Sequence, residues 1–291
     1  MIREIIPLNQ IGSVRFSEDH IICNYPLRTY SELLLLSAQI RKNLKKYSTR
    51  KILIVTDDSF EFVATLFACW SLKCIPVIAP DKLPHTIKQL EDVVACIVSN
   101  SFNESTGKLR LLWKDCEETE PIKPFFIDST TSAFELFTSG TTGIRKSIPK
   151  TFRQISNELN VLEMLWGEKI EDRISIGTVS HQHIYGLLFR LLWPLCRGTP
   201  FTSRASFYWE EIISNVNLSL CFIISSPTHL NHFSSFHDYI TKNNEGKKLV
   251  LFSSGGPLNN AVSIDAISPP INPSIVLFGL ILGNSFLLPK T

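Results

Sequence analysis

The segment from Phe137 to Lys150, FTSGTTGIRKSIPK, combines the residue types that a polyphosphate site needs. An apolar run leads into two glycines and four hydroxyl residues, which are followed by Arg145 and Lys146. Glycines let successive backbone N–H groups turn towards an anion, because no Cβ obstructs the turn. The hydroxyl groups add hydrogen-bond donors, and Lys146 adds a mobile positive charge. The segment therefore indicates a site for the phosphates of a nucleotide.

Three interpretations of this loop compete. A Walker P-loop requires G-x-x-x-x-G-K-S/T, but residues 140–147 read GTTGIRKS, so Arg145 stands where the second glycine should be. That glycine permits the tight wrap around phosphate, and the match therefore fails at its most constrained position. A surface loop without a ligand is the second interpretation. The third is the pattern S/T-S-G-S/T-T-G-x-P-K, which residues 138–146 match except that Arg145 replaces proline.

In this third interpretation the sequence resembles the adenylate-forming family of acyl-CoA synthetases, peptide-synthetase adenylation domains and luciferases. The resemblance covers essentially the whole chain, and the stretch directly after the loop looks most like the shorter acyl- or aryl-activating ligases. The order of the matching segments matters more than any one of them. Besides the loop, they are residues 57–80 (DDSFEFVATLFACWSLKCIPVIAP), residues 180–198 (SHQHIYGLLFRLLWPLCRG, with His183 and Gly186 in an H-x-x-G spacing), Ser225 to Leu230 (SSPTHL) and Ser253 to Leu258 (SSGGPL).

The resemblance implies a two-step ligase reaction. A carboxylate, acyl or aryl, would attack the α-phosphate of ATP to give an acyl-adenylate and pyrophosphate. A thiol, of coenzyme A or a carrier protein, would then take the acyl group. Most of the catalysis would consist of positioning and of charge stabilisation at the phosphoryl centre.

The same resemblance assigns the site residues. The loop would hold the β- and γ-phosphates, the Gly-Pro turn would lie against adenine, and His183 would lie beside the carboxylate or acyl group. Mg²⁺ is expected with the nucleotide. The nucleotide-binding residues implied are Thr138, Ser139, Gly140, Thr141, Thr142, Gly143, Lys146, Gly255, Gly256, Pro257, Phe278 and Gly279.

The family pattern breaks near the end of the sequence. Phe278 and Gly279 fit the start of the motif Y/F-G-x-T-E, but LILGNSFLLPKT follows, without the Thr-Glu pair that would bind magnesium. The family's ribose-binding Asp, its hinge and its small C-terminal domain with a catalytic lysine are not found either. We therefore expect residues 1–291 to form an incomplete N-terminal domain of the acyl-CoA synthetase-like fold, without the C-terminal lid domain. A frameshift near residues 279–283 is one hypothesis for this break, and a genuine C-terminus that packs as an apolar strand is the alternative.

Three functional hypotheses follow for this chain. The first is that it still activates a carboxylic acid, though impaired. The second, which we favour from sequence, is a nucleotide-binding remnant without turnover. The third is a half-enzyme or interaction module that needs a separate partner chain, such as a C-terminal fragment encoded downstream.

Four histidines and Arg145 have a structural interpretation as well as a functional one. We expect His181, His229 and His232 to be ordinary, partly buried histidines that backbone carbonyl groups satisfy. His183 keeps the spacing to Gly186 and is the candidate site histidine. Arg145 could add a phosphate contact or could simply be an exposed loop residue, and without proline the empty loop should be more mobile.

Alternating apolar and turn-forming segments predict the elements that position the loop. Strand, helix, strand, helix and strand alternate over residues 51–99, which argues for a parallel sheet covered by helices. Ser31 is the expected N-cap of the first helix, and Asp57, Asp58 and Ser59 can cap the second. The expected helices are 30–46, 60–72, 86–94, 154–166 and 185–195, and the expected strands are 51–56, 74–80, 95–99, 134–137, 174–179, 218–225 and 248–252.

Composition limits the class of protein. The 29 basic and 27 acidic residues nearly balance, which excludes a general polyanion binder and so predicts no nucleic acid partner. The 44% apolar content allows a large core. Seven cysteines without zinc-like spacing predict buried free thiols in a reducing compartment. With no signal-peptide pattern and no apolar run long enough for a membrane span, we expect a soluble, cytoplasmic protein.

Overall fold

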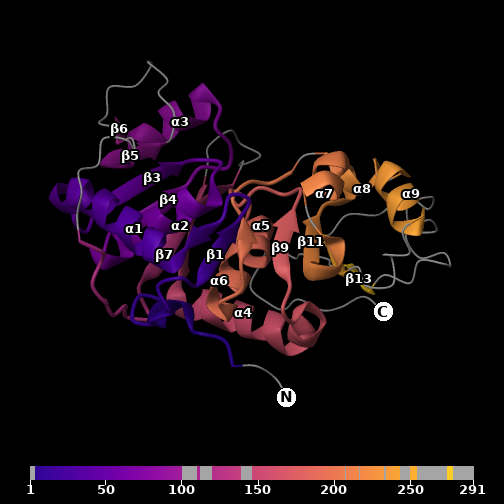
Figure 1. Ribbon diagram of the computed structural model, residues 1–291. Coiled ribbons are helices and arrows are strands. Elements are labelled where there is room, and N and C mark those ends of the chain that lie inside the picture. Colours follow the sequence, from indigo (N-terminus) through magenta and orange to yellow (C-terminus); the bar gives the residue numbers. More distant parts are fainter. Residues whose placement is uncertain are drawn as a thin grey trace.

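Two β-sheets flanked by helices make up the protein (Figure 1). The computed structural model describes residues 4–99, 110–111, 120–138, 146–206, 208–215, 217–232, 234–242, 250–253 and 274–277. Nearly all neighbouring strands in both sheets are parallel, which confirms the predicted α/β class with mainly parallel sheets.

The six-stranded sheet contains the predicted strand–helix alternation. Its order is β6-β5-β3-β4-β7-β8, and β7 with β8 is its antiparallel pair. The central strands are short, apolar and almost completely buried, as expected for a sheet covered on both faces. Its strands are β3 (Lys51–Val55), β4 (Ile75–Ile78), β5 (Cys96–Ser99), β6 (Arg110–Leu111), β7 (Ser132–Thr138) and β8 (Lys146–Thr151).

The seven-stranded sheet has the order β13-β12-β11-β9-β10-β1-β2. Only β1 and β2 are antiparallel in it, among the strands that the structure describes. Its strands are β1 (Ile21–Asn24), β2 (Arg28–Thr29), β9 (Ile174–Gly177), β10 (Phe201–Thr202), β11 (Cys221–Ser225), β12 (Val250–Ser253) and β13 (Ser274–Leu277).

Nine α-helical segments occur in the described part of the chain, and capping chemistry explains where two of them begin. The predicted N-cap Ser31 is wrong: Thr29 is extended, and its hydroxyl accepts from the Glu32 N–H while the Glu32 carboxylate accepts from the Thr29 N–H. Asp58 caps the second helix, as predicted. The helices are α1 (Tyr30–Leu44), α2 (Ser59–Ser71), α3 (Pro84–Glu91), α4 (Phe152–Trp166), α5 (Ile184–Gly186), α6 (Trp193–Arg197), α7 (Trp209–Asn215), α8 (Pro227–Leu230) and α9 (Ser234–Lys242).

One apolar core cluster extends into both sheets. Ile52 and Ile54 of one sheet belong to the same buried cluster as Phe201 and Phe222 of the other. Helix α2 is central to it, since 11 of its 13 residues are buried and the Trp70 indole donates to the Ala133 carbonyl of β7. The six described cysteines are buried free thiols, as predicted; Cys116 lies outside the described residues. In the described segments no helix has the length and apolarity to cross a membrane.

The predicted helix over 185–195 consists of three consecutive helical segments, α-helical, π-helical and again α-helical. Helix α5 passes into a π-helical segment, Leu187–Leu192, and then into α6, which ends at Gly198 in the left-handed conformation. Residues 187–192 are all buried, Arg190 among them. Strands β1, β2, β8 and β10 and helices α7 and α9 were not predicted from the sequence, mainly because they are short or polar.

Candidate functional site

The predicted phosphate loop joins the two strands of an antiparallel hairpin. Thr138 ends β7, Lys146 begins β8, and the two residues are directly opposed in the ladder. The structure therefore brings the two ends of the loop together. Ser139, Gly140, Thr141, Thr142 and Gly143 lie outside the described residues.

His183 lies in the turn that follows β9. It is the extended residue just before α5, is exposed, and its carbonyl accepts from the Leu187 N–H at 2.8 Å. The spacing to Gly186 has a steric reason, since a Cβ on Gly186 would lie 2.2 Å from the Ser180 carbonyl oxygen. The H-x-x-G pattern thus fixes a tight turn, which leaves His183 at the surface.

The carboxyl ends of three neighbouring strands of the seven-stranded sheet carry hydroxyl groups. Thr178 follows β9 and its hydroxyl is 3.0 Å from that of Ser225, the last residue of β11. Ser225 is in register with Ser253, the last residue of β12. The carboxyl edge of a parallel sheet is where open α/β folds bind ligands, so this edge is the second part of the candidate site.

Two buried polar atoms of β12 and α5 have no hydrogen-bond partner among the residues that the structure describes. They are the hydroxyl oxygens of Ser253 and Tyr185. Burial raises the pKa of Tyr185, which keeps its phenol protonated as a donor. The ring of Tyr185 lies against Phe189, which also contacts Phe252 beside Ser253. Unpaired buried hydroxyl groups are suited to hydrogen bonds with a polar ligand.

The remaining predicted nucleotide residues follow the ends of two strands. Gly255, Gly256 and Pro257 come just after β12, and Phe278 with Gly279 comes directly after β13. All five lie outside the described residues. Their strands are parallel neighbours, so both end at the hydroxyl-bearing edge.

A buried polar cluster that the sequence did not predict lies between the two sheets. The Nδ1 atom of His181 lies 3.1 Å from the Ser59 hydroxyl oxygen, and its Nε2 atom lies 3.0 Å from the Thr56 carbonyl oxygen. Arg190 donates to the Ser59 hydroxyl at 2.7 Å and to the Thr202 carbonyl at 3.0 Å. Burial, and then the Arg190 charge, lowers the pKa of His181 to about 3. Burial also lowers the pKa of Arg190 to about 10.

This cluster confirms the plain interpretation of His181, which is buried and bonded to a backbone carbonyl. His229 is different, because its Nδ1 pairs with the Ser226 hydroxyl at 2.9 Å rather than with a carbonyl. A signal for Arg190 was present in the sequence: it is the one charged residue in the apolar run LLFRLL.

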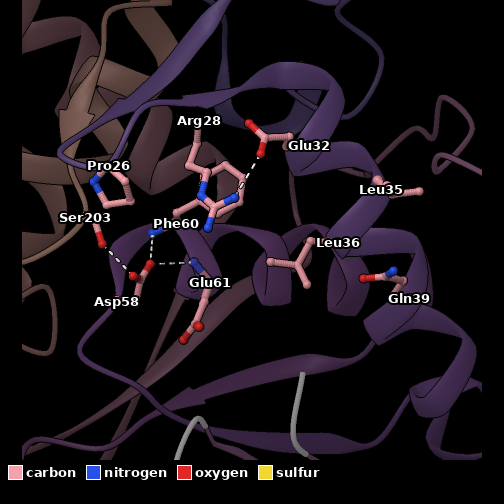
Figure 2. Close-up of a pocket in the computed structure, with 10 residues that line it drawn as sticks. All are labelled: Pro26, Arg28, Glu32, Leu35, Leu36, Gln39, Asp58, Phe60, Glu61 and Ser203. Carbon is pink, nitrogen blue, oxygen red and sulfur yellow. Dashed lines mark hydrogen bonds and ion pairs between the residues drawn. The ribbon is translucent and has the colours of Figure 1, made fainter. Parts of the chain in front are cut away.

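A cleft of about 310 Å³ opens elsewhere, between the turn before β2, helix α1 and the start of α2 (Figure 2). None of the predicted site residues line it. Its charged groups already have partners: Arg28 pairs with Glu32, and Asp58 accepts from two N–H groups of α2 and from Ser203. We therefore do not assign the nucleotide to this cleft. Its lining comprises Pro26, Arg28, Glu32, Leu35, Leu36, Gln39, Asp58, Phe60, Glu61 and Ser203.

Comparison with known proteins places the fold first. O-succinylbenzoate coenzyme A synthetase (MenE) from Bacillus subtilis, solved in complex with AMP, superposes with a TM-score of 0.76 over 95% of this chain and 59% of that chain, at 19% identity. The two-sheet architecture is thus that of an acyl-CoA synthetase-like N-terminal domain. The sequence pattern of the AMP-binding enzyme family matches residues 15–266, and the chain belongs to that family.

Two curated relatives agree with this assignment. A medium-chain-fatty-acid–[acyl-carrier-protein] ligase, JamA, from Moorena producens (strain JHB) is 29% identical over 63% of this chain and 36% of its own length. A 2-succinylbenzoate–CoA ligase from Staphylococcus aureus (strain Newman) is 23% identical over 70% of this chain and 48% of its own length. The chain therefore spans half or less of the length of these relatives.

Proposed function

We propose that this chain binds ATP and takes part in the activation of a carboxylic acid, acyl or aryl, as an acyl-adenylate. The observation that carries the proposal is the hairpin of β7 and β8, which brings the two ends of the Ser/Thr/Gly loop together inside the region that matches the AMP-binding family. The relatives that match are ligases of a fatty acid and of 2-succinylbenzoate, which supports both acid classes equally.

In this proposal the chain's own residues bind and orient the nucleotide. Residues 138–143 and Lys146 would hold the β- and γ-phosphates and neutralise their charge. Residues 255–257, with Phe278 and Gly279, would lie against the base. His183, exposed in the turn after β9, would lie beside the acid. The orphan hydroxyl groups of Ser253 and Tyr185 would meet polar groups of the ligand.

Magnesium would enter with ATP as its counter-ion. Among the residues that the structure describes, no group of three His, Cys, Asp or Glu side chains is placed to hold a metal ion. Coenzyme A and a carrier-protein thiol remain equal candidates for the acceptor, because the relatives' names include one of each. Buried free thiols support a cytoplasmic location.

The decisive experiment is carboxylate-dependent exchange of pyrophosphate into ATP. Octanoate and 2-succinylbenzoate are the two acids to compare, with an acid-free reaction as the control. Exchange with either acid supports adenylation by this chain and names the acid class. ATP binding without exchange would favour the nucleotide-binding remnant, and no ATP binding would overturn the proposal. That residues 1–291 form an incomplete domain, and that a separately encoded C-terminal fragment completes it, both stay predictions.

Lys146→Ala tests the loop itself. Loss of a charge-assisted contact with phosphate should raise the Kd for ATP about tenfold, which corresponds to ~1.4 kcal/mol. Isothermal titration of wild type and variant with Mg·ATP measures it. Lys150→Ala is the matched control, since Lys150 lies in the same strand but pairs with Glu158 at 3.4 Å. Equal affinities for wild type and Lys146→Ala would remove the loop from the site.

A further inference from the structure

A buried carboxylate lies at the base of the hairpin that carries the loop. Glu135 of β7 is 6% exposed and lies three residues before Thr138. Its Oε2 accepts from the Lys51 ammonium at 2.9 Å and from the Ser147 hydroxyl at 2.8 Å. Ser147 directly follows Lys146, so one carboxylate oxygen connects both strands of the hairpin close to the two ends of the loop.

Such a connection adds to the restraints on β8, which is an edge strand. Glu135 opposes Pro149, which has no N–H to donate. Among the strands that the structure describes, β8 lies at the edge of the six-stranded sheet and pairs with β7 alone. An edge strand has a single neighbour to fix its register, and a slip of one residue would move every side chain of the strand to the opposite face.

Side-chain geometry supplies a further restraint. Ser147 opposes Phe137, two residues beyond Glu135, and diagonal neighbours on the same face of a sheet are within reach of a long side chain. Lys51 is in β3 and opposes Ile75 of β4, so its side chain reaches across β4 to the carboxylate. The Glu135 carboxylate therefore joins the hairpin to the middle of the sheet.

We propose that Glu135, held by Lys51 and Ser147, is a positioning residue that fixes the register of β8 and thereby the place of Lys146 at the end of the phosphate loop. This inference rests on the proposed ATP site. It assigns Glu135 no contact with the nucleotide. Glu135 would affect ATP binding indirectly, because a small displacement of Lys146 would lose most of its interaction with the phosphates.

The test compares two buried carboxylates. Glu163, in the last turn of α4, is 4% exposed and accepts from Trp193 and Arg197, so Glu163→Gln also breaks a buried pair but one outside the hairpin. Both Glu135→Gln and Glu163→Gln should lower the unfolding temperature. At a temperature where both variants remain folded, only Glu135→Gln should weaken Mg·ATP binding, by about tenfold.

Hydrogen exchange gives a readout that is independent of the nucleotide. The amides of β8 that donate to β7 should exchange faster in Glu135→Gln and Ser147→Ala than in wild type, and their exchange should be unchanged in Glu163→Gln. Unchanged ATP affinity and unchanged exchange in Glu135→Gln would overturn the positioning role while leaving the ATP site intact. Failure of the wild-type chain to bind ATP would instead overturn the proposed function, and this inference with it.

Discussion

Two histidines that are two residues apart have opposite environments. The Thr56 carbonyl can only accept, so the proton of His181 is on Nε2, and Nδ1 is free to accept from Ser59 and Arg190. A second proton on Nδ1 would remove these contacts and bring a positive charge next to Arg190. His183 is exposed and is free of these constraints. His181 is thus a structural group, and His183 is the one available to a ligand.

The neutral state of His181 predicts how stability depends on pH. Its pKa is about 3 in the fold and near 6.5 when unfolded, so both states are neutral above pH 6.5 and stability there is unaffected. Below pH 6.5 the unfolded chain binds a proton that the folded chain refuses, and stability falls by up to about 1.4 kcal/mol per pH unit until pH 3. Urea unfolding at pH 7 and pH 5 measures this loss.

His181→Gln isolates the contribution, because glutamine does not titrate. Between pH 7 and pH 5 the variant should lose about 2 kcal/mol less than wild type. His183→Gln, which changes an exposed histidine, is the control and should follow wild type. The same loss in all three proteins would show that His181 is not protonated preferentially on unfolding.

At the residue scale, the sequence reveals functional candidates in local motifs but not side chains whose role depends on distant partners. The loop and the H-x-x-G turn are local, so their residue types are readable from spacing alone. Glu135 and Arg190 depend on partners 84 and 131 residues away, Lys51 and Ser59. Without the sheet order, neither residue has an evident role.

At the scale of elements, the strand–helix alternation over residues 51–99 was predictable because each strand is a short apolar run and each helix follows a turn or cap. Strand β8 was not, since Lys146, Ser147, Pro149 and Lys150 argue against a strand by propensity. Its pairing with β7 decides its conformation. The π-helical segment before α6 was not predictable from the spacing of apolar residues either.

Helix α2 offers a test of how one cap supports a buried element. The Asp58 carboxylate accepts from the N–H groups of Phe60 and Glu61 at 2.9 and 3.0 Å. Asp58→Ala leaves both donors without this acceptor and should cost about 1 kcal/mol of unfolding free energy. Asp58→Asn keeps an acceptor oxygen and should cost much less. Urea unfolding at pH 7 distinguishes them, and equal losses would mean that the charge rather than the cap matters.

At the scale of the whole molecule, we expect the two sheets to unfold together. They share an apolar core, and the Ser59–His181–Arg190 cluster bridges them with polar contacts. The sequence predicted parallel sheets but not this junction, because its three members come from three separate segments. A ligand site formed by the hairpin of one sheet and the carboxyl edge of the other would require the two sheets to keep a fixed position relative to each other.

Ser59→Ala tests that junction. The Ser59 hydroxyl accepts from Arg190 and donates to His181, so its loss leaves a buried guanidinium short of an acceptor and should cost about 2 kcal/mol. Ser71→Ala, on the same helix, removes only a bond to the Ala68 carbonyl and should cost under about 1 kcal/mol. Hydrogen exchange in increasing urea should show β3 and β9 losing protection together in both variants. Earlier loss in one sheet of Ser59→Ala would mean that this cluster, more than the apolar core, couples the sheets.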